Sequence, residues 1–262
     1  MTQAQNTNDN NGQTYEIASF GCGVDSVAGL VLMKDKGFKY DEIIFADTGS
    51  EKDETYAYLD YLTKTLGWNI TVVKSKYGVI YDYYFKKRIY PVRFVRDCTG
   101  KFKIDPFNKY LRTKYGKTAH FNVHVFIDYA EQTRVRTSKY NYSTLIYPLI
   151  EHKITRDDCI KIIQDHNMPV PVKSGCFFCP FTPPKVWRSM KMNPDTRKYF
   201  DKSLEMEKNS RMRNKKCYPL VNLRGKETMD LFDCGCFNYN TDEQENEKEL
   251  MKVFEGNYTR GF

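Results

Sequence analysis

Short apolar runs alternate with amphipathic stretches through the first third of the chain. Residues 15–20, 42–46 and 69–73 are mostly apolar and are bounded by turn residues, which predicts three buried strands. The segments between them, 27–36 and 54–66, carry apolar residues at helical spacing. This β-α-β-α-β order predicts an α/β fold with a twisted parallel sheet and helices on both faces.

The pattern is less regular in the rest of the chain. It predicts helices at 103–114, 156–166, 184–192 and 194–209, and strands at 124–127 and 144–147. Prolines at 169, 171, 180, 183 and 184 interrupt the chain, which places the residues between them on a loop. We therefore expect a disordered tail over 1–14, an α/β domain over 15–200 and a smaller, irregular helical part with cysteines over 201–262.

Glycine turns follow the first two predicted strands. The first reads Gly21-Cys22-Gly23-Val24-Asp25-Ser26 and the second reads Asp47-Thr48-Gly49. A glycine turn that leads into a helix lets backbone N–H groups approach a phosphate, and the helix N-terminus adds partial positive charge. Ligands of parallel sheets bind beyond the carboxyl ends of the strands, so both turns are predicted to face one crevice. For the first turn alone, a tight strand-to-helix connection without a ligand is an equally good interpretation.

Acidic residues in the two turns have assignable roles. Asp47, at a strand end, is suited to bind a ribose hydroxyl or a magnesium ion, and Asp25 is suited to cap its helix. The first turn lacks the Gly-Lys-Ser/Thr ending of a Walker A loop and does not follow the G-x-G-x-x-G pattern. The turn therefore belongs to neither of these two nucleotide-binding motifs.

Charge and cysteine content narrow the chemistry. The formal net charge of +8 favours an anionic partner, such as a nucleotide, a nucleic acid or a charged substrate. Eight cysteines without an export signal, two of them spaced as Cys176-Phe177-Phe178-Cys179, favour a metal, a cluster or redox chemistry over a disulfide framework. No apolar stretch approaches the roughly 20 residues that span a bilayer, so we expect a cytoplasmic protein without a membrane partner.

Several segments, in the same order along the chain, resemble the PAPS reductase and ATP pyrophosphatase superfamily, including its adenylylsulfate reductases. They are Ser19–Ser26, Phe45–Glu51, Arg96–Phe107, Ile146–Ile150 and Ser174–Cys179. The resemblance spans roughly residues 15 to 190 and implies a Rossmann-like (HUP) domain that binds an adenine nucleotide: ATP, adenylylsulfate (APS) or PAPS. The residues that it implies for the nucleotide are Ser19, Gly21, Gly23, Asp25, Ser26, Asp47, Thr48, Gly49, Lys103 and Arg134.

Departures from the family pattern occur in two of these segments. Gly21 and Cys22 stand where the family usually has Ser-Gly, which removes one hydroxyl donor. Thr99 replaces a second cysteine beside Cys98, and Phe102 replaces an arginine.

The resemblance also implies a metal centre bound by Cys98, Cys176 and Cys179. In the cluster-bearing members these cysteines bind a [4Fe–4S] cluster. Three thiolates suit a cluster with one open or differently bound iron, and Cys217, Cys234 or Cys236 would supply a fourth. Structural zinc is the alternative, because four thiolates bind it tetrahedrally, and metal-free thiols are a third interpretation.

The tail Asp233-Cys234-Gly235-Cys236-Phe237 is similar to the family's Glu-Cys-Gly-Leu-His segment, without its histidine. This similarity implies that Cys234 is the catalytic nucleophile toward an adenylylated sulfate, with Cys236 resolving the intermediate. The alternative is that both are metal ligands or buried small residues.

Three functions follow from these observations. The first is an enzyme of sulfonucleotide reduction that works beside a cysteine-bound metal centre and draws electrons from a thiol donor such as thioredoxin. The second is an ATP-dependent adenylating sulfurtransferase that acts on tRNA or DNA. The third is a zinc-stabilised nucleic-acid-binding module without catalysis.

Overall fold

The computed structural model describes residues 12–92, 97–213 and 220–221, which belong to two units. The first unit contains the chain up to Ala46, together with Ala57–Val73 and Ile104–Pro171. The second contains Asp47–Tyr56, Lys74–Lys103 and the chain from Val172 onward. Each unit is thus assembled from segments that are distant in the sequence.

The elements follow the predicted alternation of strands and helices. In chain order they are β1 (Thr14–Phe20), α1 (Val24–Asp35), β2 (Glu42–Asp47), α2 (Asp53–Asp60), the π-helical turn η1 (Tyr61–Thr65), β3 (Thr71–Lys74), α3 (Ile80–Lys87), α4 (Asp97–Thr99), the π-helical turn η2 (Gly100–Ile104), α5 (Asp105–Tyr115), β4 (His120–Val125), the 3₁₀ helix η3 (Tyr129–Arg134), β5 (Ser143–Ile146), α6 (Pro148–Glu151), α7 (Arg156–Asp165), α8 (Pro184–Met192) and α9 (Pro194–Arg213).

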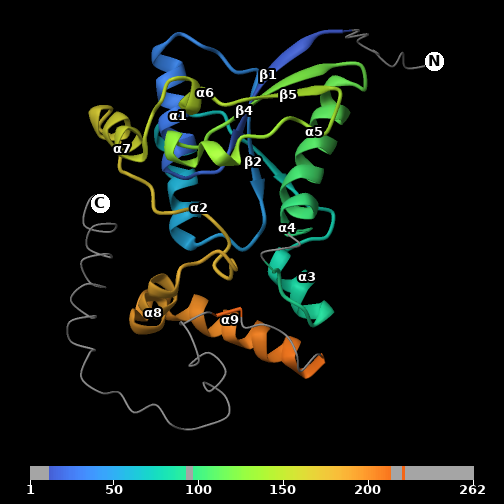
Figure 1. Ribbon diagram of the computed structural model, residues 1–262, viewed down its shortest axis with the longest axis vertical. Helices are drawn as coiled ribbons and strands as arrows, with labels where there is room; N and C mark the ends of the chain where they lie inside the picture. The colour runs from blue at the N-terminus through green and yellow to red at the C-terminus, as the bar shows by residue number, and fades with distance from the viewer. Residues whose placement is uncertain (1–11, 93–96, 214–219, 222–262) are drawn as a thin grey trace. The chain divides into compact units, whose positions relative to one another are not determined.

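A five-stranded sheet with the order β3-β2-β1-β4-β5 forms the first unit's centre (Figure 1). β1 pairs in parallel with β2 and with β4, and β4 pairs in parallel with β5. Phe20 at the end of β1 lies beside Phe45 near the end of β2, so the carboxyl ends of these two strands are neighbours. The predicted α/β fold with a parallel sheet is confirmed.

Helices cover both faces of the sheet because successive strand residues point to opposite sides. Ala18 and Phe20 of β1 pack in one core cluster with buried residues of α1, α2 and α7. Tyr15 and Ile17 of the same strand pack in another cluster with Phe107 and Leu111 of α5. The near-continuous apolar sequence of the strands follows from this burial on both sides.

The first helix begins three residues earlier than the periodicity predicts. Gly23 is its N-cap residue, and the backbone N–H of Gly23 donates to Ser26 Oγ at 3.1 Å while that hydroxyl donates to the Gly23 carbonyl at 2.9 Å. This reciprocal bonding satisfies backbone groups at the helix start and fixes the turn after β1.

The second unit has its own aromatic core. Trp187, Phe178, Phe102 and Tyr84 are almost completely buried in it, together with Met206 of α9. Helix α3 of this unit was not predicted, because its sequence is rich in tyrosine and lysine and buries only Ile80 and Tyr84. The predicted boundaries at residues 14 and 200 stay predictions, and α9 runs as one helix through residue 200.

Among the described residues, none of the helices combines the length and the apolar character that a bilayer crossing requires.

Candidate functional site

The glycine turn of the first unit presents the N-terminus of a 12-residue helix directly after the central strand. Cys22 has a φ of +55°, a left-handed conformation that costs an ordinary residue roughly 1–2 kcal/mol. Its side chain is buried in the core cluster beneath α1, whereas Gly21 is exposed. The turn therefore has the backbone shape and the exposure that an anion site at a helix N-terminus needs.

The sequence suggested that Asp25 caps the helix. In the structure Gly23 is the N-cap residue instead. The Asp25 carboxylate accepts a hydrogen bond from Arg156 of α7 at 2.6 Å. Burial raises the pKa of Asp25 above its usual value, and the Arg156 guanidinium opposes this shift. The carboxylate oxygen atoms of Asp25, Asp128 and Glu131 lie within 4.8 Å of one another, so Arg156 offsets a concentration of negative charge.

The second turn, Asp47-Thr48-Gly49, belongs to the second unit. Asp47 Oδ1 accepts hydrogen bonds from the Gly49 backbone at 2.7 Å and from the Tyr56 hydroxyl at 2.8 Å, and Asp47 Oδ2 lies 3.5 Å from the Lys74 ammonium. Gly49 has a φ of +71°, and an added Cβ would come within 2.9 Å of Val79. Here the glycine is required by both the backbone conformation and the packing.

The predicted C-x-x-C residues lie on a tight turn in the second unit. The Cys179 backbone N–H donates to the Cys176 carbonyl at 3.0 Å, and the Phe177 N–H donates to the Ser50 carbonyl at 3.1 Å. Cys176 also forms an antiparallel bridge with Glu51. These backbone bonds hold the cysteine loop against the turn that follows β2.

Side-chain contacts join the same two segments. The Thr48 hydroxyl lies 3.2 Å from Cys176 Sγ and donates to Glu51 Oε1, also at 3.2 Å. The hydroxyl has a single proton, so Thr48 donates to only one of these two partners at a time. Burial raises the pKa of Cys176 to about 12, which is consistent with a protonated thiol at neutral pH in the metal-free protein.

Lys103 supplies the positive charge of this cluster. Its ammonium lies 3.5 Å from Glu51 Oε1, and the charge of Glu51 raises the pKa of Lys103. Glu51 is almost fully buried, and within the described residues its second oxygen, Oε2, has no hydrogen-bond partner. A buried oxygen of this kind costs about 1–3 kcal/mol unless a further donor or cation satisfies it.

The three predicted metal ligands lie in the same unit. Burial raises the pKa of Cys179, and the nearby Cys98 raises it further. The sulfur atoms of Cys98, Cys176 and Cys179 are not all within 4.8 Å of one another, as the described residues are placed. Three cysteine thiols in one unit are donors that suit an iron–sulfur cluster and also suit zinc.

Other predicted residues lie apart from these groups or outside the described residues. Ser19 is a half-buried residue of β1, and Arg134 forms an ion pair with Glu131 on η3. Cys234, with Cys217, Cys236 and Arg96, lies outside the described residues.

Glu51 and Arg156 are charged residues of these clusters to which the sequence pattern assigned no role. Glu51 was part of a quoted motif, but its burial had no signal in the sequence. Arg156 follows the helix-capping residue Thr155, and a role beside Asp25 required the fold, because 131 residues separate the two in sequence.

Comparison with known proteins identifies the family of this chain. The family model for the phosphoadenosine phosphosulfate reductase domain matches residues 16–171. A solved structure of phosphoadenylyl-sulfate (PAPS) reductase from Candida auris, a phosphate complex, is similar over 65% of this chain and 84% of that chain, with 15% sequence identity and a TM-score of 0.45. No curated protein matches the chain. Since the family model covers more than half of the sequence, the chain belongs to the phosphoadenosine phosphosulfate reductase domain family.

Proposed function

We propose that this protein is an enzyme that binds an adenine nucleotide bearing a sulfate through the glycine turn before α1 and reduces it. The observation that carries the proposal is that turn: Gly23 caps a 12-residue helix directly after the central strand, inside the segment that matches the family. Exposed Gly21 leaves room for a ligand, and the first N–H groups of α1 are the donors for a phosphate.

The reaction that we propose uses two thiols. The Cys234 thiolate attacks the sulfur of the sulfonucleotide, so that an S–S bond forms and the S–O bond to the nucleotide phosphate breaks. A second thiol, for which Cys236 is our candidate, attacks Cys234 and releases sulfite, leaving a disulfide. The two electrons come from these thiols, and an external dithiol donor of the thioredoxin kind restores them.

We further propose that Cys98, Cys176 and Cys179 hold an iron–sulfur cluster in the second unit. Such a cluster would supply redox capacity at this place. The thiols would lose their protons on binding, and the Lys103 ammonium would offset part of the resulting negative charge. The tight turn that carries Cys176 and Cys179, with Cys98 close enough to raise the pKa of Cys179, supports the proposal, because these residues offer three thiolates from one unit.

Nucleotide binding is testable with matched variants at Gly21. Its φ is not positive, and an added Cβ would meet only Ser26 Oγ, at an ordinary 3.8 Å, so a side chain fits without strain. Gly21→Asp places a carboxylate beside the proposed phosphate, whereas Gly21→Asn adds the same volume without charge. Isothermal titration of the full chain with PAPS, APS and ATP should show binding that Gly21→Asp weakens at least tenfold more than Gly21→Asn, about 1.4 kcal/mol.

Two results would overturn this assignment. Equal affinities of the two Gly21 variants would remove the turn from the nucleotide site, and tight binding of ATP alone, with release of pyrophosphate, would favour an adenylating enzyme.

Cys234→Ser should abolish sulfite release while nucleotide binding persists. Full sulfite release by that variant would exclude Cys234 as the nucleophile.

The metal proposal has its own readout. Protein purified without oxygen should be coloured and contain about four iron atoms per chain. Cys176→Ser should lose most of this iron, whereas Cys159→Ala, at a buried position on α7 in the first unit, should keep it. A colourless protein loaded with zinc would contradict the cluster.

A further inference from the structure

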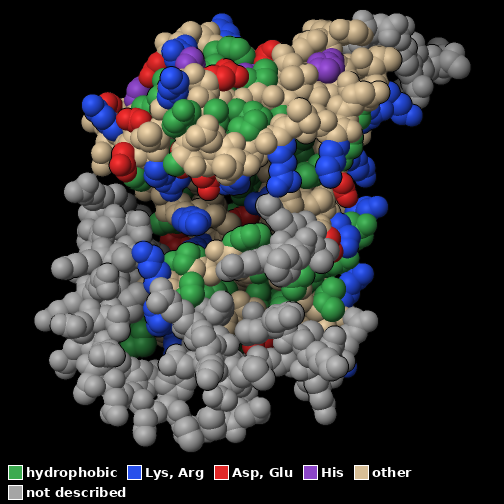
Figure 2. Space-filling view, in the orientation of Figure 1, with side chains coloured by type: hydrophobic (Ala, Val, Ile, Leu, Met, Phe, Trp, Pro, Cys, Tyr) green, Lys and Arg blue, Asp and Glu red, His purple; other side chains and the backbone are tan. Residues whose placement is uncertain are grey.

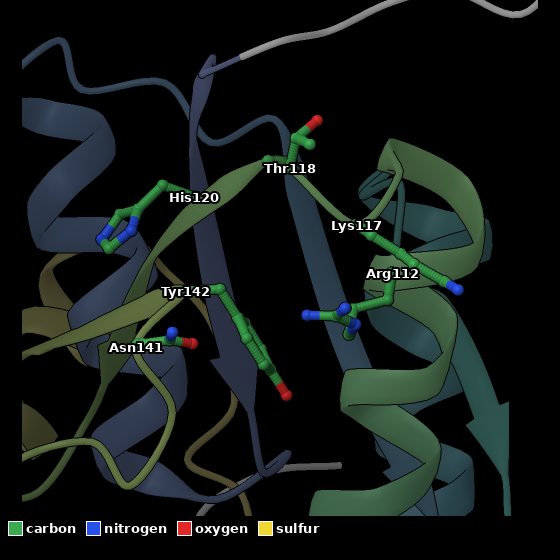
Figure 3. Close-up of a pocket in the computed structure, with 7 residues that line it drawn as sticks. Arg112, Lys117, Thr118, His120, Asn141 and Tyr142 are labelled. Atoms are coloured by element: carbon green, nitrogen blue, oxygen red, sulfur yellow. The ribbon is translucent and has the colours of Figure 1, made fainter.

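A polar cavity lies at the amino-terminal edge of the sheet, within the first unit. Its volume is about 370 Å³, in the usual range for ligand pockets. Its lining includes Arg112, Lys117, Thr118, His120, Asn141 and Tyr142 (Figure 3). His120 begins β4 and Tyr142 directly precedes β5, whereas the glycine turn follows the carboxyl end of β1. The cavity is therefore separate from the proposed nucleotide site.

The cavity carries positive charge without a matching acid. Its lining contains no carboxylate, and within the described residues neither Arg112 nor Lys117 forms an ion pair. In Figure 3 the Arg112 guanidinium points toward Tyr142, and the Lys117 ammonium points away from that ring. Figure 2 shows further lysine and arginine side chains on the side where Figure 1 places α5. Uncompensated charge of this sign attracts anions.

Two aromatic rings lie in series beside the Arg112 guanidinium. The Arg112 guanidinium lies 4.4 Å from the centroid of the Tyr142 ring, and Tyr140 stacks on Tyr142 at 5.1 Å with an interplanar angle of 25°. Tyr140 is 37% exposed, so this series of stacked groups ends at solvent. An arginine over an aromatic ring keeps the N–H groups at the edge of its guanidinium plane available for a phosphate.

We propose that this cavity binds single-stranded nucleic acid. Arg112 binds a backbone phosphate in the cavity, Thr118 and Asn141 contribute polar contacts, and a neighbouring base stacks on Tyr140. Single-strand sites in other proteins combine the same two elements, positive charge for the backbone and exposed aromatic rings for the bases. A free nucleotide fits less well, because the lining is mostly polar and offers no enclosed apolar slot for a base.

The test measures binding of a labelled single-stranded oligonucleotide, about ten nucleotides long, to the full chain by fluorescence anisotropy over a range of salt. Arg112→Gln should weaken binding about tenfold and lower the slope of log K against log salt by about 1. The control Lys161→Gln removes the same charge from an exposed position on α7, which packs on the opposite face of the sheet, and should change affinity less than twofold. Tyr140→Ala, at an exposed position, should weaken binding about fivefold to tenfold without a change in slope.

Three results would overturn the proposal. They are absence of oligonucleotide binding by the unaltered protein, equal losses in Arg112→Gln and Lys161→Gln, and displacement of the oligonucleotide by AMP or inorganic phosphate at similar affinity. Thermal melting of each variant shows whether a loss of binding comes from unfolding, and Tyr140→Ala tests the cavity even where Arg112→Gln melts early. Gly21→Asp should leave oligonucleotide binding unchanged, which separates this site from the nucleotide site.

Discussion

Glu42 is a buried carboxylate that collects hydrogen bonds from four side chains. Tyr115 donates at 2.8 Å and Tyr110 at 3.0 Å, and Thr71 and Lys114 donate as well. Burial raises the pKa of Glu42, but the four donors more than offset this effect, so that its pKa lies below the ordinary value of about 4.5. The ionised form is therefore stabilised in the folded protein.

This network predicts a pH-dependent stability. A group whose pKa is lowered by folding stabilises the protein above its unfolded pKa, and this contribution is lost as the pH falls through the folded pKa. Glu42→Gln should lower the free energy of unfolding by about 2 kcal/mol at pH 7, and the deficit should shrink as the pH falls below about 4.5. Urea titrations across this pH range measure the difference.

The exposed Glu151 of α6 offers the control for that measurement. Glu151→Gln should stay within about 0.5 kcal/mol of the unaltered protein at each pH. A deficit of Glu42→Gln that stays constant from neutral to acid pH would show that lost packing, and not the ionised carboxylate, is responsible.

At single residues, the sequence indicates chemistry but not contacts. Cys176, Thr48 and Lys103 were all recognised by their motifs, yet the contact of Thr48 with Cys176 joins residues 128 positions apart. Glu51 was not assigned a role, because burial of a glutamate depends on which segments fold over it. The nucleotide and metal assignments of these residues stay predictions.

Close packing of α1 depends on Gly29. A Cβ added at this position would lie 2.1 Å from Cδ1 of Phe126, a buried residue directly after β4. In an unobstructed helix, replacing glycine with alanine stabilises by about 1 kcal/mol. Here the Phe126 ring would have to move within a packed core, which typically costs about 1–3 kcal/mol.

Gly29→Ala should therefore lower the free energy of unfolding by about 1 kcal/mol or more. In a Phe126→Ala background, where the ring is absent, the same change should instead stabilise by up to about 1 kcal/mol. Chemical denaturation of the four proteins in this cycle measures both effects. Stabilisation by Gly29→Ala alone would show that the ring yields without cost.

Helices and strands were predictable where the apolar periodicity and the flanking turn residues indicate the same element. The three early strands, α1 and the helices α7 and α8 lie close to where the pattern places them, because apolar spacing and turn residues agree there. The pattern missed α3, where few buried positions mark the helix, and it predicted α2 and η1 as one continuous helix over 54–66. Helix α1 started early because Gly23 and Ser26 form a capping arrangement that hydrophobic spacing alone does not show.

For the whole chain, the sequence predicted the family and the parallel sheet, both of which are confirmed. It did not predict the division into two units. The second unit is built from three segments, which begin at the last residue of β2, at the last residue of β3 and after Pro171. Such a division depends on contacts between distant segments, which a pattern read along the chain does not contain.

The central place of β1 in the sheet affects how the protein is made on the ribosome. β1 is translated first and gains β2 as a neighbour soon afterwards, but its other neighbour, β4, begins only at His120. At bacterial or eukaryotic translation rates, the roughly 100 residues in between take about 5–20 s to synthesise. During that time β1, which is the central strand of the finished sheet, has one edge without a partner strand. Nascent chains are therefore more prone to aggregate than finished ones.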